Sequence, residues 1–528
     1  MAQYRLDNQQ IGQPGNRYEI MMVGTIDGEV VTAYNPLPTY QVGATATSAF
    51  GEPLGITLTP VIQADAIYGL NPREWETYTT GNGAVVVNNS VITVSSGTAV
   101  GSYGVLRTKQ LLRYQPGQGA LARFTAAFPT PNTYVTQRAG FLSQEQSLMV
   151  GYDGDNFGVV RINGGKADIR LLTILTNAAF SETATITLNG NAFSVPLLAG
   201  NTEYIASQIS VFNFGSSWLV EQVGSGVKIA SSTNGAKSNT YAFSSNGSAT
   251  GSFSQIQTGV SDTQNWTYQS NFNIDTLDGS GNTASNPSGM LISPEFMNVF
   301  QINYRWLGVG EIRYAVENPS TGQLIFFHKE HHSGAHLSPH LDNPSMRLGY
   351  VSANKSANVC ANTSVKGICM MGAIEGMRNT HGHSFSKSVS KSTLTSATNH
   401  HVLSIRNPYM FDGKFNLKNV RLRQISVAYQ GNDPVELYLV LNPTYNTQPL
   451  WTNINASESI VYYSDSTSTI TMNNNSPLTT YIVPINGGVL YDVADLNIEL
   501  SPNTQLSFVV KSGQNIASIS LAATWVEE

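Results

Sequence analysis

The sequence predicts a mainly β protein that is built from several domains. Apolar and polar residues alternate in short segments such as residues 122–128, and Pro-Gly, Asn-Gly and Asp-Gly steps separate these segments. Long amphipathic helical patterns are missing. A chain of 528 residues is also too long for a single core. We therefore expect about three or four domains made of antiparallel sheet.

The composition excludes two classes of partner. Charged residues make up 12% of the chain, about half the usual share. The net charge is −6, whereas nucleic-acid binding needs clustered Lys and Arg, so we expect no nucleic acid. No segment approaches the length of a membrane span, and the first residues lack the pattern of a secretory leader. We expect no membrane span and no secretion by a leader peptide.

Residues 1–100 are predicted to form an extended, partly β-structured arm for attachment. Pro36, Pro38, Pro53 and Pro60 argue against a compact helical domain, because each proline lacks a backbone donor and restricts φ.

Residues 101–167 and 261–377 are predicted to be two halves of one β-sandwich. The first half contains the alternating segment and the run Asp153-Gly154-Asp155-Asn156. We interpret this run as a hairpin turn and not as a calcium loop, because Phe157 stands where an oxygen ligand is required. The second half contains the strand pattern NVFQINYRWLGVGEIRYAVENPSTG.

Residues 168–260 interrupt this sandwich and are predicted to be a small α+β domain. The Asn189-Gly190 step is a strong hairpin signal. Ile205 and Ile209 follow a capping candidate, Asn201 or Thr202, which predicts a short helix over about residues 202–212.

The remaining chain is predicted to be a linker and a second sandwich. Residues 378–400 are rich in Ser, Asn, His and Lys, which is typical of a solvated linker. Residues 401–528 carry the strand patterns HVLSIRNPYMFDGKFNLKNVRLRQISVAY, PVELYLVLNPTYN and SISLAATWVEE, and we expect a C-terminal β-sandwich there.

These blocks, together with GVLRTKQLLRYQPGQGALARFTAAFPTPNTYVTQRAG, resemble predicted structural proteins, tail or fibre-like, of tailed, mostly marine, phages and of some large viruses. The resemblance implies a lectin-like, concanavalin-type β-sandwich that is split by the insert. It also implies a non-enzymatic virion protein, made in the host cytoplasm, that serves as a tail, collar or head fibre-like component. Its expected partners are other virion proteins, further copies of itself, with a trimer favoured, and host surface glycans.

The alternative function is a glycan-binding adhesin or a depolymerase acting on host surface polysaccharide. Its site would lie on the concave face of the split sandwich. A depolymerase needs two carboxylates across the scissile bond, and the signature Glu-x-Asp-x-x-Glu is absent, so we expect no enzyme. The aromatic residues Tyr152, Phe157, Tyr304 and Trp306 could stack on sugars, but strand positions favour a role in the core.

All nine histidines fall between His328 and His401, and one pair is a candidate metal site. The spacings match no HExxH or zinc-ribbon pattern. His381 and His383 form a His-x-His step, which in trimeric phage fibres can place six imidazoles around one iron. We favour the linker interpretation and expect no cofactor, with iron at His381 and His383 as the alternative.

Overall fold

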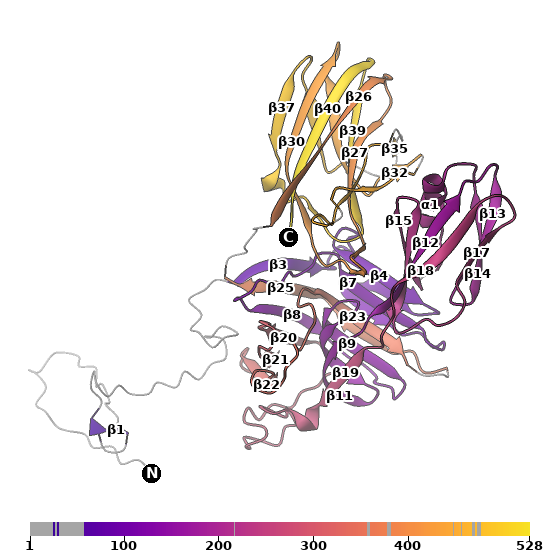
Figure 1. The fold of residues 1–528 in the computed structure, drawn as a ribbon. Coiled ribbons are helices and arrows are strands. Elements are labelled where there is room, and N and C mark those ends of the chain that lie inside the picture. Colours follow the sequence, from indigo (N-terminus) through magenta and orange to yellow (C-terminus); the bar gives the residue numbers. More distant parts are fainter. Residues whose placement is uncertain are drawn as a thin grey trace, which may run out of the picture.

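The computed structural model describes residues 58–528 apart from 216, 356–358, 377–381, 447, 456, 467–469 and 472–476. It also describes two short paired strands, β1 (Thr25–Ile26) and β2 (Glu29–Val30). The chain forms three lobes of antiparallel sheet (Figure 1). In the sequence, the second lobe lies between two groups of strands that belong to the first.

The first lobe is a sandwich of two large sheets and one small sheet. The seven-stranded sheet has the order β19 (Thr263–Tyr268), β11 (Asn156–Asn163), β10 (Ser147–Asp153), β9 (Val135–Leu142), β23 (Arg347–Asn354), β7 (Tyr103–Thr108), β4 (Trp75–Thr80). The six-stranded sheet has the order β22 (Leu324–Glu330), β21 (Ile312–Glu317), β20 (Asn298–Tyr304), β8 (Ala120–Ala126), β25 (Cys369–Glu375), β3 (Leu58–Asp65). A three-stranded sheet contains β24 (Ser364–Gly367), β6 (Val91–Ser95) and β5 (Ala84–Asn88), and the 3-10 turn η2 (Gln269–Asn271) follows β19.

Aromatic rings from both large sheets meet in the core of this sandwich. Phe300 of β20 lies 6.0 Å from Phe124 of β8 and 6.4 Å from Phe157 of β11, between ring centroids. Phe141 of β9 packs edge-on against Tyr304 at 5.1 Å. Side chains at successive positions of a strand point to opposite faces of the sheet, so every second residue of these strands faces the core. One face of each large sheet is therefore buried.

The predicted boundary of the N-terminal arm is wrong. Residues 1–100 were expected to be an extended arm, but β3, β4, β5 and β6 lie within this range and pair with strands of the sandwich. Pro60 lies in β3 at a shift in the register opposite Ala373, and β3 is an edge strand, the place where a sheet tolerates proline. The sandwich therefore begins by Leu58.

The second lobe is the insert, which contains two sheets and the helix. One sheet has the order β15 (Trp218–Val223), β16 (Gly226–Asn234), β12 (Ala167–Thr176), β18 (Thr250–Gln257) and the other has the order β14 (Asn191–Leu197), β13 (Glu182–Leu188), β17 (Ala242–Ser245). The predicted helix is confirmed as α1 (Thr202–Ser210), capped by Asn201. The predicted hairpin is confirmed too, because Asn189 and Gly190, with φ of 49° and 85°, join β13 to β14.

The third lobe is a second β-sandwich. Its first sheet has β26 (His383–Leu394), β40 (Ile516–Glu527), β30 (Val420–Gly431) and β37 (Gly488–Asp492) in order, with β38 (Glu499–Leu500) also on β30. Its second sheet has the order β33 (Thr452–Asn453), β34 (Tyr462–Ser464), β27 (His400–Asn407), β39 (Thr504–Ser512), β31 (Val435–Leu441), β36 (Thr479–Val483). Shorter elements are β28 (Met410–Phe411), β29 (Lys414–Phe415), β32 (Thr444–Tyr445), β35 (Ile470–Thr471) and the 3-10 turn η3 (Ala494–Leu496).

The predicted linker over residues 378–400 is corrected in the same way. Most of it is β26, which pairs with β40 from His383 to Leu394. Val389 is buried and Phe385 packs on the core, whereas the Ser and Lys residues between them are mostly exposed. A polar edge strand of this kind resembles a linker in composition, because only one face is covered.

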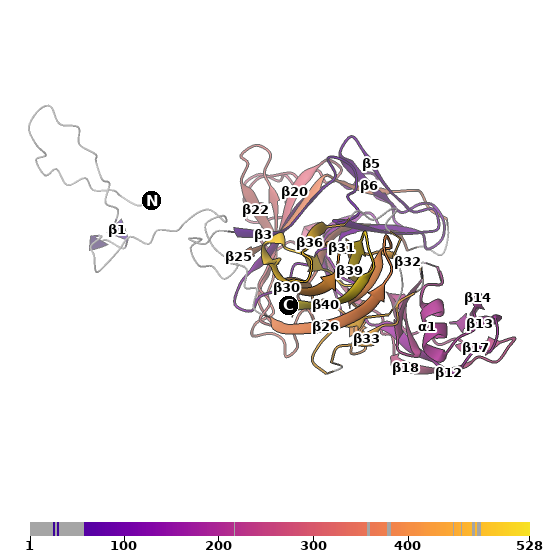
Figure 2. The same cartoon turned by 90° about the horizontal axis from the view of Figure 1, so that it is seen from above.

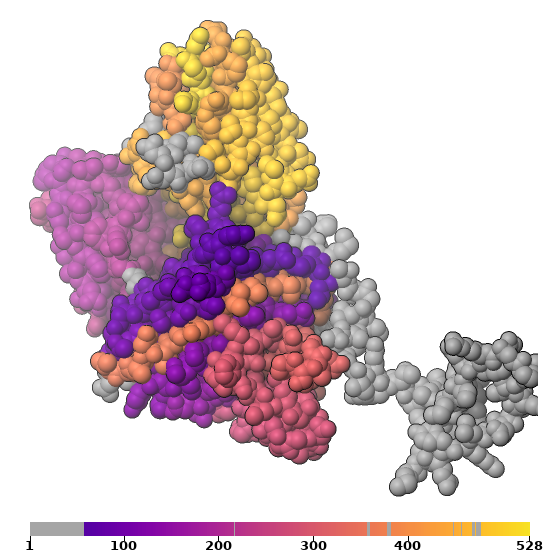
Figure 3. Space-filling model, turned by 180° about the vertical axis from the view of Figure 1, so that it is seen from behind, coloured from indigo at the N-terminus to yellow at the C-terminus, as the bar shows by residue number. Residues whose placement is uncertain are grey.

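The predicted fold class is confirmed: the protein is mainly β and multidomain, with a lectin-like sandwich interrupted by a small α+β insert and a C-terminal β-sandwich. Seen from above, the C-terminal sandwich lies over the lectin-like sandwich and the insert projects to one side (Figure 2). The space-filling view shows the C-terminal sandwich (yellow) above the first lobe and the insert (magenta) beside it (Figure 3). No helix in the described part of the chain is both long and apolar enough to cross a bilayer.

Candidate functional site

The outer face of the seven-stranded sheet, turned away from the core, carries two rows of opposed residues. Leu106, Ala139 and Val150 point into the core, so their neighbours in each strand point outward. One row contains Glu76, Arg107, Gly349, Gly140, Met149, Val160 and Trp266, and the next contains Tyr78, Val105, Val351, Arg138, Gly151, Gly158 and Tyr268. The rows place Trp266 and Tyr268 at the β19 edge, Arg138 on the central strand β9, and Arg107 near the β4 edge.

Trp266 and Tyr268 form a flat aromatic surface at the β19 edge. Their ring planes differ by 15° and their centroids are 6.2 Å apart, and both residues are half-buried. The Tyr268 hydroxyl donates to Asp153 Oδ2 at 3.1 Å, and Lys355 Nζ makes an ion pair with Asp153 Oδ1. Flat rings bordered by polar groups are suited to stacking against the apolar face of a sugar.

Arg138 lies in the same row as Tyr268, across Gly151 and Gly158. Its Nε and Nη1 are buried and donate to no acceptor among the described residues. Burial lowers the pKa of the Arg138 guanidinium, and the carboxylates of Asp262 and Asp153 oppose that shift. Buried donors of this kind normally have a hydrogen-bond partner, so Nε and Nη1 of Arg138 can donate to a water molecule or to a ligand.

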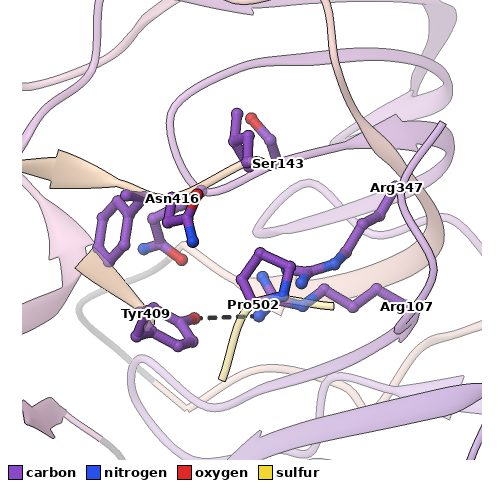
Figure 4. A pocket seen from close by; sticks show the side chains of 9 residues that line it. Arg107, Ser143, Arg347, Tyr409, Asn416 and Pro502 are labelled. Carbon is purple, nitrogen blue, oxygen red and sulfur yellow. Dashed lines mark hydrogen bonds between the residues drawn. The ribbon is translucent and has the colours of Figure 1, made fainter. Parts of the chain in front are cut away.

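The opposite end of the outer face is covered by the C-terminal sandwich. Arg107 Nε donates to Glu76 Oε2 at 2.9 Å, and its Nη2 donates to the hydroxyls of Tyr78 and Tyr409 at 2.7 and 3.1 Å. Tyr409 belongs to the third lobe, and Figure 4 shows its contact with Arg107 beside a small pocket. This end of the sheet is therefore a domain junction.

A second polar junction joins the insert to the C-terminal sandwich. Arg406 Nη2 lies 3.3 Å from Glu221 Oε1 and donates to the carbonyl oxygen of Gln222 at 2.9 Å. The Arg406 guanidinium also lies 4.5 Å from the ring centroid of Trp451. Burial raises the pKa of Glu221, and the charge of Arg406 opposes this effect. The ion pair is largely buried, and it joins a side chain of the insert to a side chain of the C-terminal sandwich.

The candidate metal residues predicted from the sequence are not brought together in a described site. His381 lies outside the described residues, and His383 is exposed at the start of β26. The structure instead groups His332, His336 and His340, with His332 4.0 Å from His336 and 5.4 Å from His340 between ring centroids. Over the described ranges, no group of three or more His, Cys, Asp or Glu is arranged to hold a metal ion.

Two other interpretations of the sequence are confirmed. Asp153 and Asn156 close a β10–β11 hairpin with a two-residue turn, as expected. The aromatic residues assigned to the core belong there: Phe157 and Tyr304 are buried, and Tyr152 and Trp306 pack against them from partly exposed positions.

Sequence reasoning missed Trp266, Tyr268 and Arg138. The signal for the two aromatics was the Trp-x-Tyr spacing on one strand, because period two places both rings on the same face.

Comparisons with known proteins assign no family. No family model matches the chain, and no curated protein matches it. The Emp47p carbohydrate recognition domain is similar with a TM-score of 0.25 and 12% identity, over 61% of this chain and 97% of that domain. A legume lectin-like domain from Entamoeba histolytica has a TM-score of 0.21 and 8% identity, over 60% and 98%. A structure from Sulfolobus Turreted Icosahedral Virus has a TM-score of 0.15 and 8% identity, over 90% and 98%. Likenesses at these scores carry no function over to this chain.

Proposed function

We propose that this chain is a non-enzymatic structural component of a virion, a tail, collar or head fibre-like part made in the host cytoplasm. The resemblance of its sequence blocks to such proteins suggests the class. The observation that carries the proposal is the pair of buried junctions at Arg107–Tyr409 and Glu221–Arg406, which join three β lobes. A particle component needs its domains held in one arrangement, because neighbouring subunits must meet fixed surfaces.

The carboxylates of the outer face support a role without catalysis. Burial acts to raise the pKa of Glu76, but the charges of Arg107 and Arg347 and hydrogen bonds from Tyr78 and Arg107 lower it overall. Asp153 is held by Lys355 and Tyr268. The general acid of a glycosidase needs a carboxyl group whose pKa is raised and which can approach the oxygen of the leaving group.

Assembly is the property to test first. We expect the full chain to purify as a defined homo-oligomer, with a trimer favoured, in light scattering after size exclusion, and antibodies against it to label particles in electron microscopy. Removing residues 1–57 should abolish incorporation and leave the melting temperature of the rest unchanged. A monodisperse monomer that labels no particle would contradict the proposal.

Glycan contact is a second candidate function, favoured by the Trp266–Tyr268 surface. The two parallel rings lie beside Asp153 and Lys355, which supply an acceptor and a donor for sugar hydroxyls. The surface would let a virion component contact carbohydrate on a host.

Replacing one ring tests this second function. Trp266→Ala should weaken binding to any recognised glycan at least about fivefold in a glycan array followed by titration, since ring stacking contributes roughly 1 kcal/mol or more. Tyr68→Ala is the matched control, because Tyr68 is fully exposed and lies in the loop before β4, which is at the opposite edge of the sheet from β19. Equal binding by the wild type and Trp266→Ala would exclude this surface.

A further inference from the structure

Two arginine side chains are buried close together where the lectin-like sandwich meets the C-terminal sandwich. The exposed fractions of Arg107 and Arg347 are 4% and 6%. Arg107 lies opposite Gly349 in the sheet, so Arg347, two residues earlier, is its diagonal neighbour on the same face. Figure 4 shows both side chains reaching the same pocket. Two positive charges therefore occupy a region largely closed to water.

Among the described residues, one carboxylate, that of Glu76, makes an ion pair with these arginines. Glu76 accepts from Arg107 Nε at 2.9 Å, and the other acceptors on Arg107 are the neutral hydroxyls of Tyr78 and Tyr409. Glu76 is also the carboxylate among the main influences on the pKa of Arg347. Because arginine stays protonated in proteins, the cluster of Arg107, Arg347 and Glu76 keeps an excess positive charge.

Arg347 has donors to spare. Its Nε donates to the carbonyl oxygen of Lys109 at 3.2 Å, and its two terminal nitrogens meet no acceptor within the described part of the chain. Burial and the charge of Arg107 lower the pKa of Arg347, as expected where a cation lacks compensation. An unpaired buried charge is costly, so a compensating anion is the physical expectation.

A cavity of about 10 Å³ lies beside these donors. Its walls include Ser143 of the lectin-like sandwich and Phe415, Asn416 and Pro502 of the C-terminal sandwich. Asn416 Nδ2 already donates to Asn407 Oδ1 at 2.6 Å. Ser143 Oγ donates to the carbonyl oxygen of Gln146 at 2.9 Å. A volume of this size is about the least that one water-sized particle needs, which favours a monatomic anion over an anion with several heavy atoms.

We propose that this cavity binds one monatomic anion of the halide class, chloride in ordinary buffers, against the guanidinium groups of Arg107 and Arg347. The anion balances the excess charge and accepts from the terminal nitrogens of Arg347. Because both sandwiches supply walls of the cavity, the bound anion links the two lobes. The inference is independent of the function proposed above.

Crystals of the full chain grown in sodium bromide test the site directly. We expect an anomalous difference peak between Arg107 and Arg347. In solution, the melting temperature should be at least about 2 °C higher in sodium bromide or chloride than in sodium gluconate at equal ionic strength, since an anion bound only by the folded state stabilises it.

Variants separate this site from general salt effects. Arg347→Met should abolish the difference between halide and gluconate, whereas Arg73→Met, at an exposed arginine, should keep it. If Arg347→Met does not fold, the bromide peak in the wild type decides alone. An empty or water-filled cavity at high bromide, together with equal melting temperatures in both salts, overturns the proposal.

Discussion

His401 lies inside the C-terminal sandwich with both ring nitrogens in contact with oxygens. Nδ1 lies 2.7 Å from the carbonyl oxygen of Ser466, so Nδ1 carries the proton, and Nε2 lies 2.8 Å from Ser404 Oγ, which donates to it. The ring is 2% exposed, and burial lowers the pKa of His401 to about 4. The folded protein therefore holds this imidazole neutral.

This residue makes stability depend on pH. Below about pH 6.5 the unfolded chain protonates His401 while the folded chain does not until about pH 4, so the unfolded state binds more protons. The free energy of unfolding should fall by up to about 3 kcal/mol as the pH drops through this window. His401→Gln should flatten that slope in urea unfolding measured from pH 4 to 7. An unchanged slope would contradict this, and His383→Gln, at an exposed position, serves as the control.

The single helix shows how local signals set an element. Asn201 Oδ1 accepts from the backbone N–H of Tyr204 at 2.9 Å, and Ile205 and Ile209 bury the inner face of α1. The sequence left Asn201 and Thr202 as alternative caps, and the structure assigns Asn201. A cap satisfies an orphan backbone donor at the start of a helix.

Asn201→Ala should therefore destabilise the first turn of α1 by about 1 kcal/mol. We expect roughly fivefold faster hydrogen exchange at the amides of this turn in the full chain, because local opening becomes that much more frequent. Thr202→Ala should change the rates by far less. Faster exchange in Thr202→Ala than in Asn201→Ala would reverse the assignment.

Elements defined by short-range patterns were predictable, and those defined by their neighbours were not. The Asn189-Gly190 turn needs positive φ at both residues, and that requirement is written in two adjacent positions. β26 becomes a strand only because β40 pairs with one edge of a serine-rich segment and the core of the sandwich covers one face of it. Arg107 and Arg347, on the outer face, meet because β7 and β23 are adjacent in the sheet, which no local pattern reveals.

At the scale of the whole molecule, the contact between Glu221 and Arg406 controls how two lobes meet. Glu221→Gln removes the counter-charge of a buried guanidinium, which costs about 3–5 kcal/mol for such pairs. We expect a lower melting temperature and faster proteolysis near residues 409–417. Glu203→Gln, at an exposed helix position, should have little effect. Replacing both partners, as Glu221→Leu with Arg406→Met, should recover part of the loss.

The insert should be removable. Lys166 and Val260 exchange two backbone hydrogen bonds of 2.9 Å, so the two ends of the lobe are adjacent. Deleting residues 168–260 behind a short Gly-Ser bridge, with Arg406→Met to avoid an unpaired charge, should leave a folded remainder with a cooperative thermal transition. If that protein is insoluble while Asn201→Ala is soluble, the insert supports the sandwich and is not an independent lobe.

The bridge between Lys166 and Val260 also defines a segment of the gene that can be exchanged as a unit. Two crossovers in the gene, one at each side of this bridge, exchange an entire lobe without altering the register of any strand in the host sandwich. A foreign domain grafted at this position also removes Glu221, so the graft should carry Arg406→Met to avoid leaving that buried guanidinium unpaired.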